Sequence, residues 1–353
     1  MSDIADLLRR RGHEVGLLER SSLATSHWRA GAGMLAGGLD PQEVDAAVRD
    51  LRADVVHVHN VHPLFGWRAL AAARARGART VFHVHNFRLF CAISVSYYDG
   101  APCYRCRGRN TWPGLRLRCR GSVVEAATYA VGLRRQQPRL FEHAERFVVL
   151  SQAHGARLTE LGLPGERATT LPNFIPQANL AAASASADGR YALVSGRLVP
   201  EKGFDTAVAA ARAAGVPLIV AGEGPDAGRL RELAGDAEVT FTGQLTRERL
   251  AEVRRQAGAV LVPSRCEEAC PYSVLDALGD GVPVLASDRG GLPEMVDPES
   301  VLPAEDQGAW DEALKQMWQD REARGRAGAA ALDRAREQFS EHDYYNRLLE
   351  IYA

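Results

Sequence analysis

Residues 191–222 read YALVSGRLVPEKGFDTAVAAARAAGVPLIVAG, and this stretch decides the fold. An apolar run at 191–194 leads into a glycine-flanked loop, then a helical pattern, then a second apolar run at 216–221. A strand–helix–strand unit of this kind builds a parallel sheet. Both runs are apolar throughout rather than alternating, which is typical of strands that helices cover on both faces.

The same unit recurs along nearly the whole chain and predicts an α/β protein with two sheets. Strands are expected at 15–18, 54–58, 79–84, 146–151 and 168–171, and again at 191–194, 216–221, 238–242, 259–263 and 282–286. Helical patterns follow at 310–320 and 321–337, and Ser340 is a predicted N-cap for a last helix that ends at Ala353. In such sheets a ligand is expected at the carboxyl ends of the strands.

An Ala/Ser-rich stretch with neither strand nor helix periodicity separates the two halves and predicts a linker. The expected organisation is an N-terminal domain at 1–175, a linker at 176–189 and a C-terminal domain at 190–338. The helix at 339–353 is expected to cross back to the N-terminal domain.

The start of the chain departs from this plan. Ile4, Leu7 and Leu8 form one face of a helix before the strand at 15–18, whereas a doubly wound domain should begin with a strand. We therefore expect an N-terminally shortened version of a protein that starts about 20 to 30 residues upstream.

Composition excludes several classes. The chain has 353 residues, 46% of them hydrophobic and 25% charged, which excludes a disordered or fibrous protein. A net charge of -1 gives no basic surplus, so no nucleic-acid partner is expected. The sequence contains neither a long apolar run nor a signal-peptide pattern, which favours a cytoplasmic location.

Two constellations carry candidate chemistry. Gly196, Arg197 and Lys202 lie on the loop after the strand at 191–194, where two cations could hold a diphosphate. The alternative is a solvated loop with ordinary surface cations. Glu268 precedes a predicted helix at 271–279, and Asp276 lies within that helix. Both carboxylates could bind sugar hydroxyls. In the alternative, Glu268 only interacts with the helix dipole and Asp276 is a solvated side chain.

Together these motifs resemble glycosyltransferase family 4. The resemblance rests on the Gly-Arg-x-x-x-x-Lys-Gly loop at 196–203, the Glu268–Asp276 spacing, the run at 281–294, and the segments 220–225 and 241–243. It implies the GT-B fold, in which two Rossmann-like doubly wound domains face a central cleft. It also implies a retaining transferase that moves a sugar from a nucleotide diphosphate to an acceptor hydroxyl.

The resemblance implies a role for each matching residue. Arg197 and Lys202 would stabilise the leaving diphosphate, Glu268 would contact the donor sugar, and Asp276 would hold the ribose, where the family usually has Glu. The backbones of Gly290 and Gly291 would approach phosphate or sugar. The implied donor-binding set also contains Gly196, Gly243 and Leu245. His85 matches the histidine that faces the donor sugar; the alternative is a structural histidine like His57, His59, His62 and His83.

The resemblance implies a nucleotide-sugar donor and no required cofactor. UDP-sugars are the more frequent donors in the family, with GDP- and ADP-sugars as alternatives, and the acceptor is a glycan, a lipid-linked or a small molecule. A Rossmann oxidoreductase is disfavoured because neither half has the Gly-x-Gly-x-x-Gly loop, and bound nicotinamide cofactor would be needed to support it. A catalytically impaired or scaffold relative stays open, because the expected first strand and its glycine-rich loop are missing.

One segment is rich in both cysteine and arginine. Cys91, Cys103, Cys106 and Cys119 could close a structural zinc site; reduced thiols or a redox-labile pair are the alternatives. Residues 105–139 hold nine arginines and one glutamate beside apolar side chains such as Trp112. This segment could meet an anionic membrane at its inner face or a lipid diphosphate acceptor; otherwise it is a solvated basic loop and a core helix.

Overall fold

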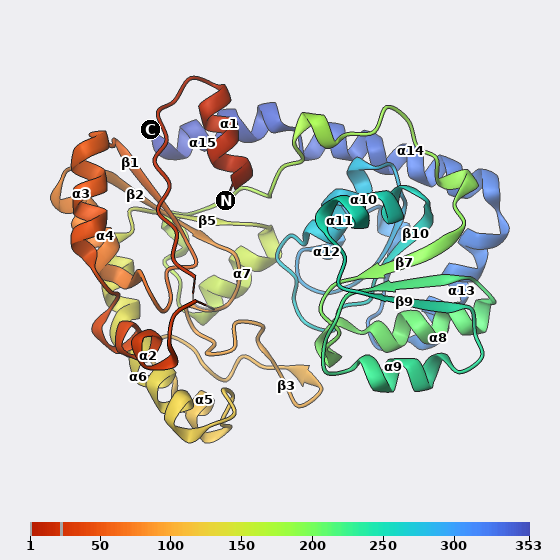
Figure 1. Ribbon diagram of the computed structural model, residues 1–353, viewed down its shortest axis with the longest axis horizontal. Coiled ribbons are helices and arrows are strands. Elements are labelled where there is room, and N and C mark those ends of the chain that lie inside the picture. Colours follow the sequence, from red (N-terminus) through yellow and green to blue (C-terminus); the bar gives the residue numbers. More distant parts are fainter. Residues whose placement is uncertain (1, 22–23) are drawn as a thin grey trace. The chain divides into compact units, whose positions relative to one another are not determined.

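The computed structural model describes residues 2–21 and 24–353 and divides into two compact units (Figure 1). The first unit comprises Met1–Tyr98, Cys103–Leu171 and Tyr345–Ala353. The second comprises Asp99–Pro102 and Pro172–Tyr344. Each unit is built on its own parallel sheet.

The first sheet has four parallel strands in the order β1-β2-β5-β6. They are β1 (Val55–His59), β2 (Arg79–Val84), β5 (Arg146–Val149) and β6 (Ala168–Thr170). The helices of this unit are α1 (Ser2–Arg10), α2 (His27–Ala36), α3 (Pro41–Leu51), α4 (Gly66–Ala75), α5 (Trp112–Arg116), α6 (Val123–His143), α7 (Gln152–Leu161) and η1 (Gly165–Arg167). Phe82, Leu140 and Phe147 meet in its core. A short hairpin joins β3 (Tyr97–Tyr98) to β4 (Ala101–Pro102).

The second sheet has six strands in the order β12-β11-β10-β7-β8-β9. They are β7 (Tyr191–Ser195), β8 (Leu218–Ala221), β9 (Val239–Gly243), β10 (Ala257–Val262), β11 (Val284–Ser287) and β12 (Val301–Leu302). The chain builds one side from β7 outward and then returns to build the other from β10. The boundary between β7 and β10 is therefore the topological switch point, where doubly wound sheets bind their ligands.

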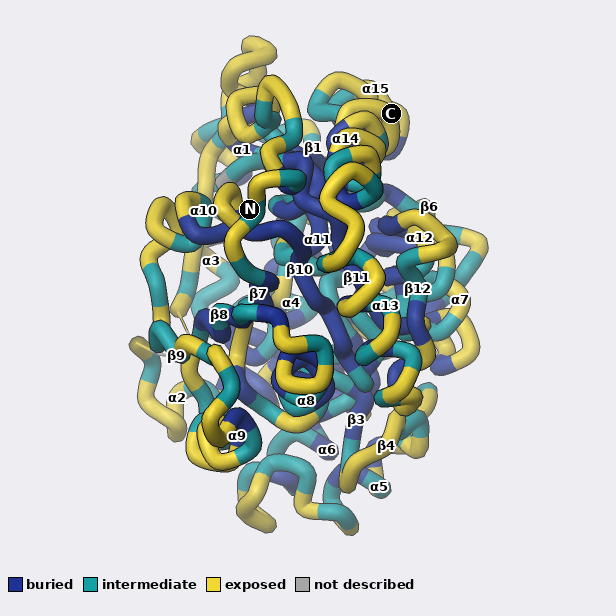
Figure 2. The backbone as a smooth tube through the Cα atoms, turned by 90° about the vertical axis from the view of Figure 1, so that its right-hand side faces the viewer, coloured by how far each residue is buried: buried dark blue, intermediate teal, exposed yellow. Residues whose placement is uncertain are grey.

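Helices cover this sheet, and β10 is buried along its whole length (Figure 2). The α-helices of this unit are α8 (Phe204–Ala214), α9 (Ala227–Ala234), α10 (Arg247–Arg255), α11 (Tyr272–Gly279), α12 (Leu292–Met295), α13 (Gln307–Gln319) and α14 (Arg321–Gln338). The last helix, α15 (Glu341–Tyr352), begins in this unit and belongs to the first unit from Tyr345 on. The 3-10 turns are η2 (Gln177–Asn179), η3 (Ser186–Asp188), η4 (Pro200–Lys202) and η5 (Pro298–Ser300). Trp310 and Leu314 of α13 are fully buried in the core that α8 shares.

The predicted α/β class and parallel sheets are confirmed, and nine of the ten predicted strands are present. Ser340 caps α15 as predicted, because its hydroxyl accepts the Asp343 amide at 3.1 Å. The helix over Ile4, Leu7 and Leu8 is also present as α1.

The predicted strand at 15–18 is wrong. Among the described residues this segment has no ladder partner, and β1 pairs only with β2. A strand exists only where a neighbour takes its hydrogen bonds, so apolar residues alone do not make one. Leu17 and Leu18 are instead each 45% exposed.

No helix among the described residues combines the length and hydropathy needed to cross a bilayer.

Candidate functional site

An ion pair between Lys202 and Glu268 lies at the switch point of the second unit. Lys202 ends η4 on the loop after β7, and Glu268 lies on the loop after β10. The Lys202 Nζ donates to Glu268 Oε1, and the Ser264 hydroxyl donates to the same oxygen at 2.9 Å. The two side chains are 26% and 15% exposed, so the pair is largely shielded from water.

Backbone contacts lock these two loops together. A Cβ on Gly203, whose φ is +66°, would overlap the carbonyl oxygen of Pro263, so only glycine permits this approach. The Glu201 carbonyl accepts the amides of Arg265 and Cys266 at 2.9 and 3.2 Å. The geometry of the Lys202–Glu268 pair is therefore set by the backbone rather than by flexible side chains.

The two predicted cations differ in environment. Burial by itself lowers the pKa of Lys202, but the Glu268 carboxylate and the nearby Cys266 outweigh burial, and the pKa is raised above its ordinary value. Arg197 is 62% exposed and lies 3.7 Å from Glu201. Lys202 is thus a held, permanent cation, whereas Arg197 projects a solvated guanidinium from the same loop.

Glycines bring the carboxyl ends of β7, β8 and β9 into close contact. The Gly196 amide donates to the Ala221 carbonyl, and the Gly222 amide to the Gly243 carbonyl, both at 2.9 Å. A Cβ on Gly222 would overlap the Gly196 carbonyl. Gly222 was not among the predicted site residues, although it lies in the segment 220–225 that carried the resemblance. Leu245 is half-buried just after β9.

Gly291 contacts the Glu268 backbone directly. Its amide donates to the Glu268 carbonyl at 2.7 Å and so positions the Glu268 backbone, while the approach of the Gly291 backbone to phosphate or sugar stays a prediction. Gly290 has a φ of +58°, and a Cβ there would lie 2.8 Å from the Glu268 nitrogen. The two glycines therefore support Glu268 from the loop after β11.

Asp276 also has a protein partner. It lies in α11, and its Oδ2 accepts from Arg254 Nη1 at 3.2 Å, while Arg254 Nε donates to Asp280 at 2.7 Å. This ion-pair network orients the carboxylate that was predicted to hold the ribose. Arg254 and Ser264 were not among the predicted residues, because no local pattern marks a residue that acts by holding another.

His85 directly follows β2 in the first unit and shares a hydrogen bond of 2.7 Å with His59, joining His85 Nε2 to His59 Nδ1. Burial lowers the pKa of His85 to about 4, so the imidazole is neutral near pH 7. The Asn86 side chain accepts the Arg88 amide at 2.9 Å and thereby shapes the turn that follows.

The four cysteines of the first unit are all free thiols and half-buried. Burial, with a smaller contribution from the other three thiols, raises the pKa of Cys106 to about 11. Among the described residues, the group whose candidate ligand atoms all lie within 4.8 Å is a set of histidines and not these cysteines. The structural zinc site on the cysteines stays a prediction.

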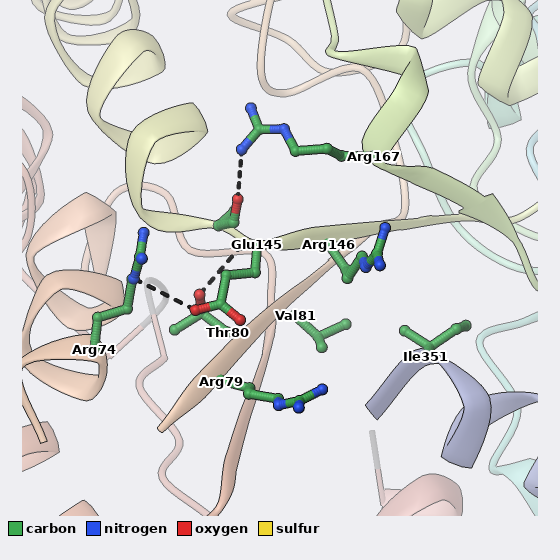
Figure 3. Close-up of a pocket in the computed structure, with 9 residues that line it drawn as sticks. Arg74, Arg79, Thr80, Val81, Glu145, Arg146, Arg167 and Ile351 are labelled. Carbon is green, nitrogen blue, oxygen red and sulfur yellow. Dashed lines mark hydrogen bonds and ion pairs between the residues drawn. The ribbon is translucent and has the colours of Figure 1, made fainter. Parts of the chain in front are cut away.

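A cavity of about 330 Å³ lies in the first unit, where four arginines surround it (Figure 3). It is lined by Arg79 and Thr80 at the amino end of β2, opposite the end that His85 follows. Two of the arginines that line the cavity also interact with the surrounding structure. Arg167 donates to the Ala144 carbonyl at 2.9 Å, and Arg74 Nε lies 3.5 Å from Glu145 Oε1. This cavity is therefore distinct from the predicted donor-binding residues.

Two family descriptions cover nearly the whole chain. Residues 1–173 match the family described as Glycosyl transferase 4-like domain, and residues 177–334 match Glycosyl transferases group 1.

Named relatives and solved structures agree with these matches. The D-inositol 3-phosphate glycosyltransferase of Mycobacteroides abscessus is 33% identical over 70% of this chain and 55% of its own. A GDP-mannose-dependent phosphatidylinositol monomannoside mannosyltransferase of Mycobacterium tuberculosis is 37% identical over 28% of this chain and 30% of its own. The chain thus spans only part of these relatives. Sucrose-phosphate synthase from Thermosynechococcus elongatus shares the fold, with a TM-score of 0.70 at 18% identity, over 99% of this chain and 91% of that one.

Proposed function

The chain belongs to the family 4 type of glycosyltransferases, with the GT-B fold, and on that premise we propose that it transfers a sugar from a nucleotide-diphosphate sugar to an acceptor hydroxyl with retention of configuration. The observation that carries the proposal is the Lys202–Glu268 pair at the switch point between β7 and β10. A shielded cation beside a carboxylate can serve a ligand that has both a diphosphate and a sugar.

The proposed mechanism depends on charge that develops during the reaction. When the bond between sugar and diphosphate breaks, negative charge grows on the leaving oxygen, and a fixed cation stabilises that charge more than it stabilises the bound donor. Lys202 supplies this cation, and Arg197 supplies a second guanidinium on the same loop. Glu268 contacts sugar hydroxyls, Asp276 contacts the ribose, and the neutral His85 contacts the donor sugar.

We propose GDP-mannose as the first donor to test. The M. tuberculosis relative is named as GDP-mannose-dependent, which supports this choice over the UDP-sugars that are frequent in the family. The test is a thermal-shift screen of GDP-, UDP- and ADP-sugars, followed by an assay of nucleotide diphosphate release with acceptor present.

The outcomes of this test separate the open alternatives. A stabilising donor that is turned over supports the transferase, and NMR of the product's anomeric linkage then tests retention. A donor that binds without turnover supports the catalytically impaired relative. If no nucleotide sugar shifts the melting temperature, the proposal fails.

We further propose that the acceptor is lipid-linked and that the segment 105–139 meets an anionic membrane. Trp112 is 55% exposed, and Val123 and Val124 at the start of α6 are 51% and 71% exposed, next to the arginines of this segment. Apolar side chains flanked by cations suit the headgroup region of such a membrane.

Cosedimentation with vesicles tests this second proposal. We expect binding to vesicles that contain phosphatidylglycerol and none to pure phosphatidylcholine. The variant Val124→Asp should weaken binding, whereas Tyr272→Ala, which alters a 48% exposed aromatic side chain of the second unit, should not. Equal binding of Val124→Asp and the wild type would exclude this surface.

A further inference from the structure

Four histidines occupy one face of two neighbouring strands, the half-buried β1 and the buried β2, and the proposed transferase chemistry uses only one of them. His57 and His59 lie on β1, His83 lies on β2, and His85 follows it. His59 is in register with His83, and side chains alternate along a strand, so all four point to the same side of the sheet. We call these four residues the histidine cluster. Buried parallel strands usually present aliphatic side chains instead.

The hydrogen bonds of the cluster leave ring nitrogens without a partner. The Nδ1 of His57 shares a hydrogen bond of 2.7 Å with the Tyr352 hydroxyl, and its Nε2 is buried and has no partner among the described residues. His83 is fully buried, and neither of its ring nitrogens has a partner among those residues. Buried polar atoms are almost always satisfied, so these orphans require an explanation.

Three rings of the histidine cluster bring nitrogens close together. One ring nitrogen from each of His57, His59 and His83 lies within 4.8 Å of the others. The Nδ1 atoms of His57 and His59 are hydrogen-bonded to Tyr352 and His85, and ligating imidazoles commonly make such a second hydrogen bond through their other nitrogen. We propose that His57, His59 and His83 form a three-histidine site for a borderline divalent cation of the zinc type, with its fourth position left open.

The chemistry of the cluster favours such a cation. The three candidate ligands are all imidazoles, and no carboxylate or thiol belongs to the group. Neutral imidazoles suit zinc, nickel and copper, whereas magnesium and calcium prefer oxygen ligands. Three histidines with an open fourth position are an established zinc arrangement in other proteins.

Metal binding requires the rings to turn. The His57 and His83 rings are stacked, with centroids 5.3 Å apart and planes 6° from parallel. An imidazole binds a metal in its own plane, so stacked rings must rotate about their Cβ–Cγ bonds to converge on one ion. His83 makes no hydrogen bond with a described residue that this rotation would break, whereas a rotation of His57 or His59 would exchange its hydrogen bond to Tyr352 or His85 for the bond to the metal.

The test measures zinc bound by the untagged full chain after chelator treatment and dialysis against zinc, without reference to transferase activity. We expect one equivalent of zinc in this site. The affinity for zinc should be weaker by about tenfold or more in His57→Gln. The control His27→Gln alters a histidine that is 96% exposed and should bind zinc as the wild type does. No retained zinc, or unchanged affinity in His57→Gln, would overturn the proposal.

Cobalt substitution separates this site from the cysteines. Cobalt bound only by imidazole and water lacks the intense sulfur-to-metal charge-transfer absorption that thiolate ligands produce. We expect the wild type to show a cobalt spectrum that lacks this absorption, and His57→Gln to lose that spectrum. A purely thiolate spectrum in the wild type would overturn the proposal. If circular dichroism shows that His57→Gln does not fold, Tyr352→Phe replaces it, because losing the hydroxyl that orients His57 should also weaken zinc binding.

Discussion

The exchange of a single cation tests the site at the scale of one residue. Lys202→Ala removes the charge next to Glu268, and we expect turnover to fall by about a hundredfold or more with a smaller effect on donor binding. Steady-state kinetics with the donor identified by the screen measures both quantities. Lys315→Ala, at an exposed position of α13, is the matched control and should leave them unchanged. Near-normal turnover in Lys202→Ala would remove Lys202 from the catalytic set.

The same substitution has a second, independent readout. Glu268 is only 15% exposed, so losing its partner leaves a poorly hydrated carboxylate. We expect the free energy of unfolding of the second unit to fall by about 1 to 3 kcal/mol, measured by urea denaturation. Lys202→Met, which fills the space without the charge, should be destabilised to a similar extent. A Met variant as stable as the wild type would show that packing, and not the ion pair, holds these loops.

At the scale of elements, the loop after β11 is expected to tolerate only glycine at position 290. Gly290→Ala places a methyl group 2.8 Å from the Glu268 nitrogen at a φ of +58°, so the Glu268 backbone must shift. We expect a loss of about 1 kcal/mol or more in stability together with reduced turnover. Gly228→Ala in α9 meets nothing within 4 Å and should instead stabilise the chain by roughly 0.5 to 1 kcal/mol. If both variants behaved alike, the support of Glu268 by this loop would be refuted.

The start of α15 offers a second test of an element. The Ser340 hydroxyl accepts the Asp343 amide, so Ser340→Ala should cost about 1 kcal/mol in urea denaturation. Ser340→Asp keeps an acceptor at the cap and should retain the wild-type stability. A neutral Ser340→Ala would mean that water satisfies the amide equally well.

Elements that depend on local pattern were predictable from the sequence, and those that depend on a neighbour were not. The continuous apolar runs of β2 and β10 indicated buried strands directly. The segment 15–18 has a similar pattern but no partner among the described residues, and β12 has only two residues, too few to show a pattern.

The candidate site shows the same division. The motifs marked Lys202 and Glu268 individually, but their ion pair joins residues 66 positions apart, and only the order of the strands brings them together. The alternation that puts His57 and His59 on one face is visible in the sequence. Their position beside His83 follows from the register of β1 on β2, which no local pattern specifies.

For the whole molecule, the histidines are distributed very unevenly. Of ten histidines, nine lie in the first unit and only His342 lies in the second. Burial lowers the pKa of His62 and His154 to about 3 and that of His85 to about 4. These folded-state pKa values lie below the ordinary histidine value of 6.5. Between pH 6.5 and the folded-state values the unfolded chain therefore binds more protons than the folded chain, and stability falls as the pH drops through this range.

Scanning calorimetry should therefore resolve the two units by their response to acid. Each histidine that folding keeps neutral lowers the free energy of unfolding by about 1.4 kcal/mol for every pH unit below its ordinary pKa. Because the first unit contains several such histidines, a change from about pH 7.5 to about pH 5.5 should lower its melting temperature by about 10 °C or more. The melting temperature of the second unit should change much less. This transition is identified by adding GDP or UDP, which should raise its melting temperature because ligand binding stabilises the native state. The double variant His57→Gln/His62→Gln should reduce the acid shift of the first transition and leave the second where it is. Equal acid shifts of both transitions, or no shift of either, would contradict the buried neutral state of these histidines.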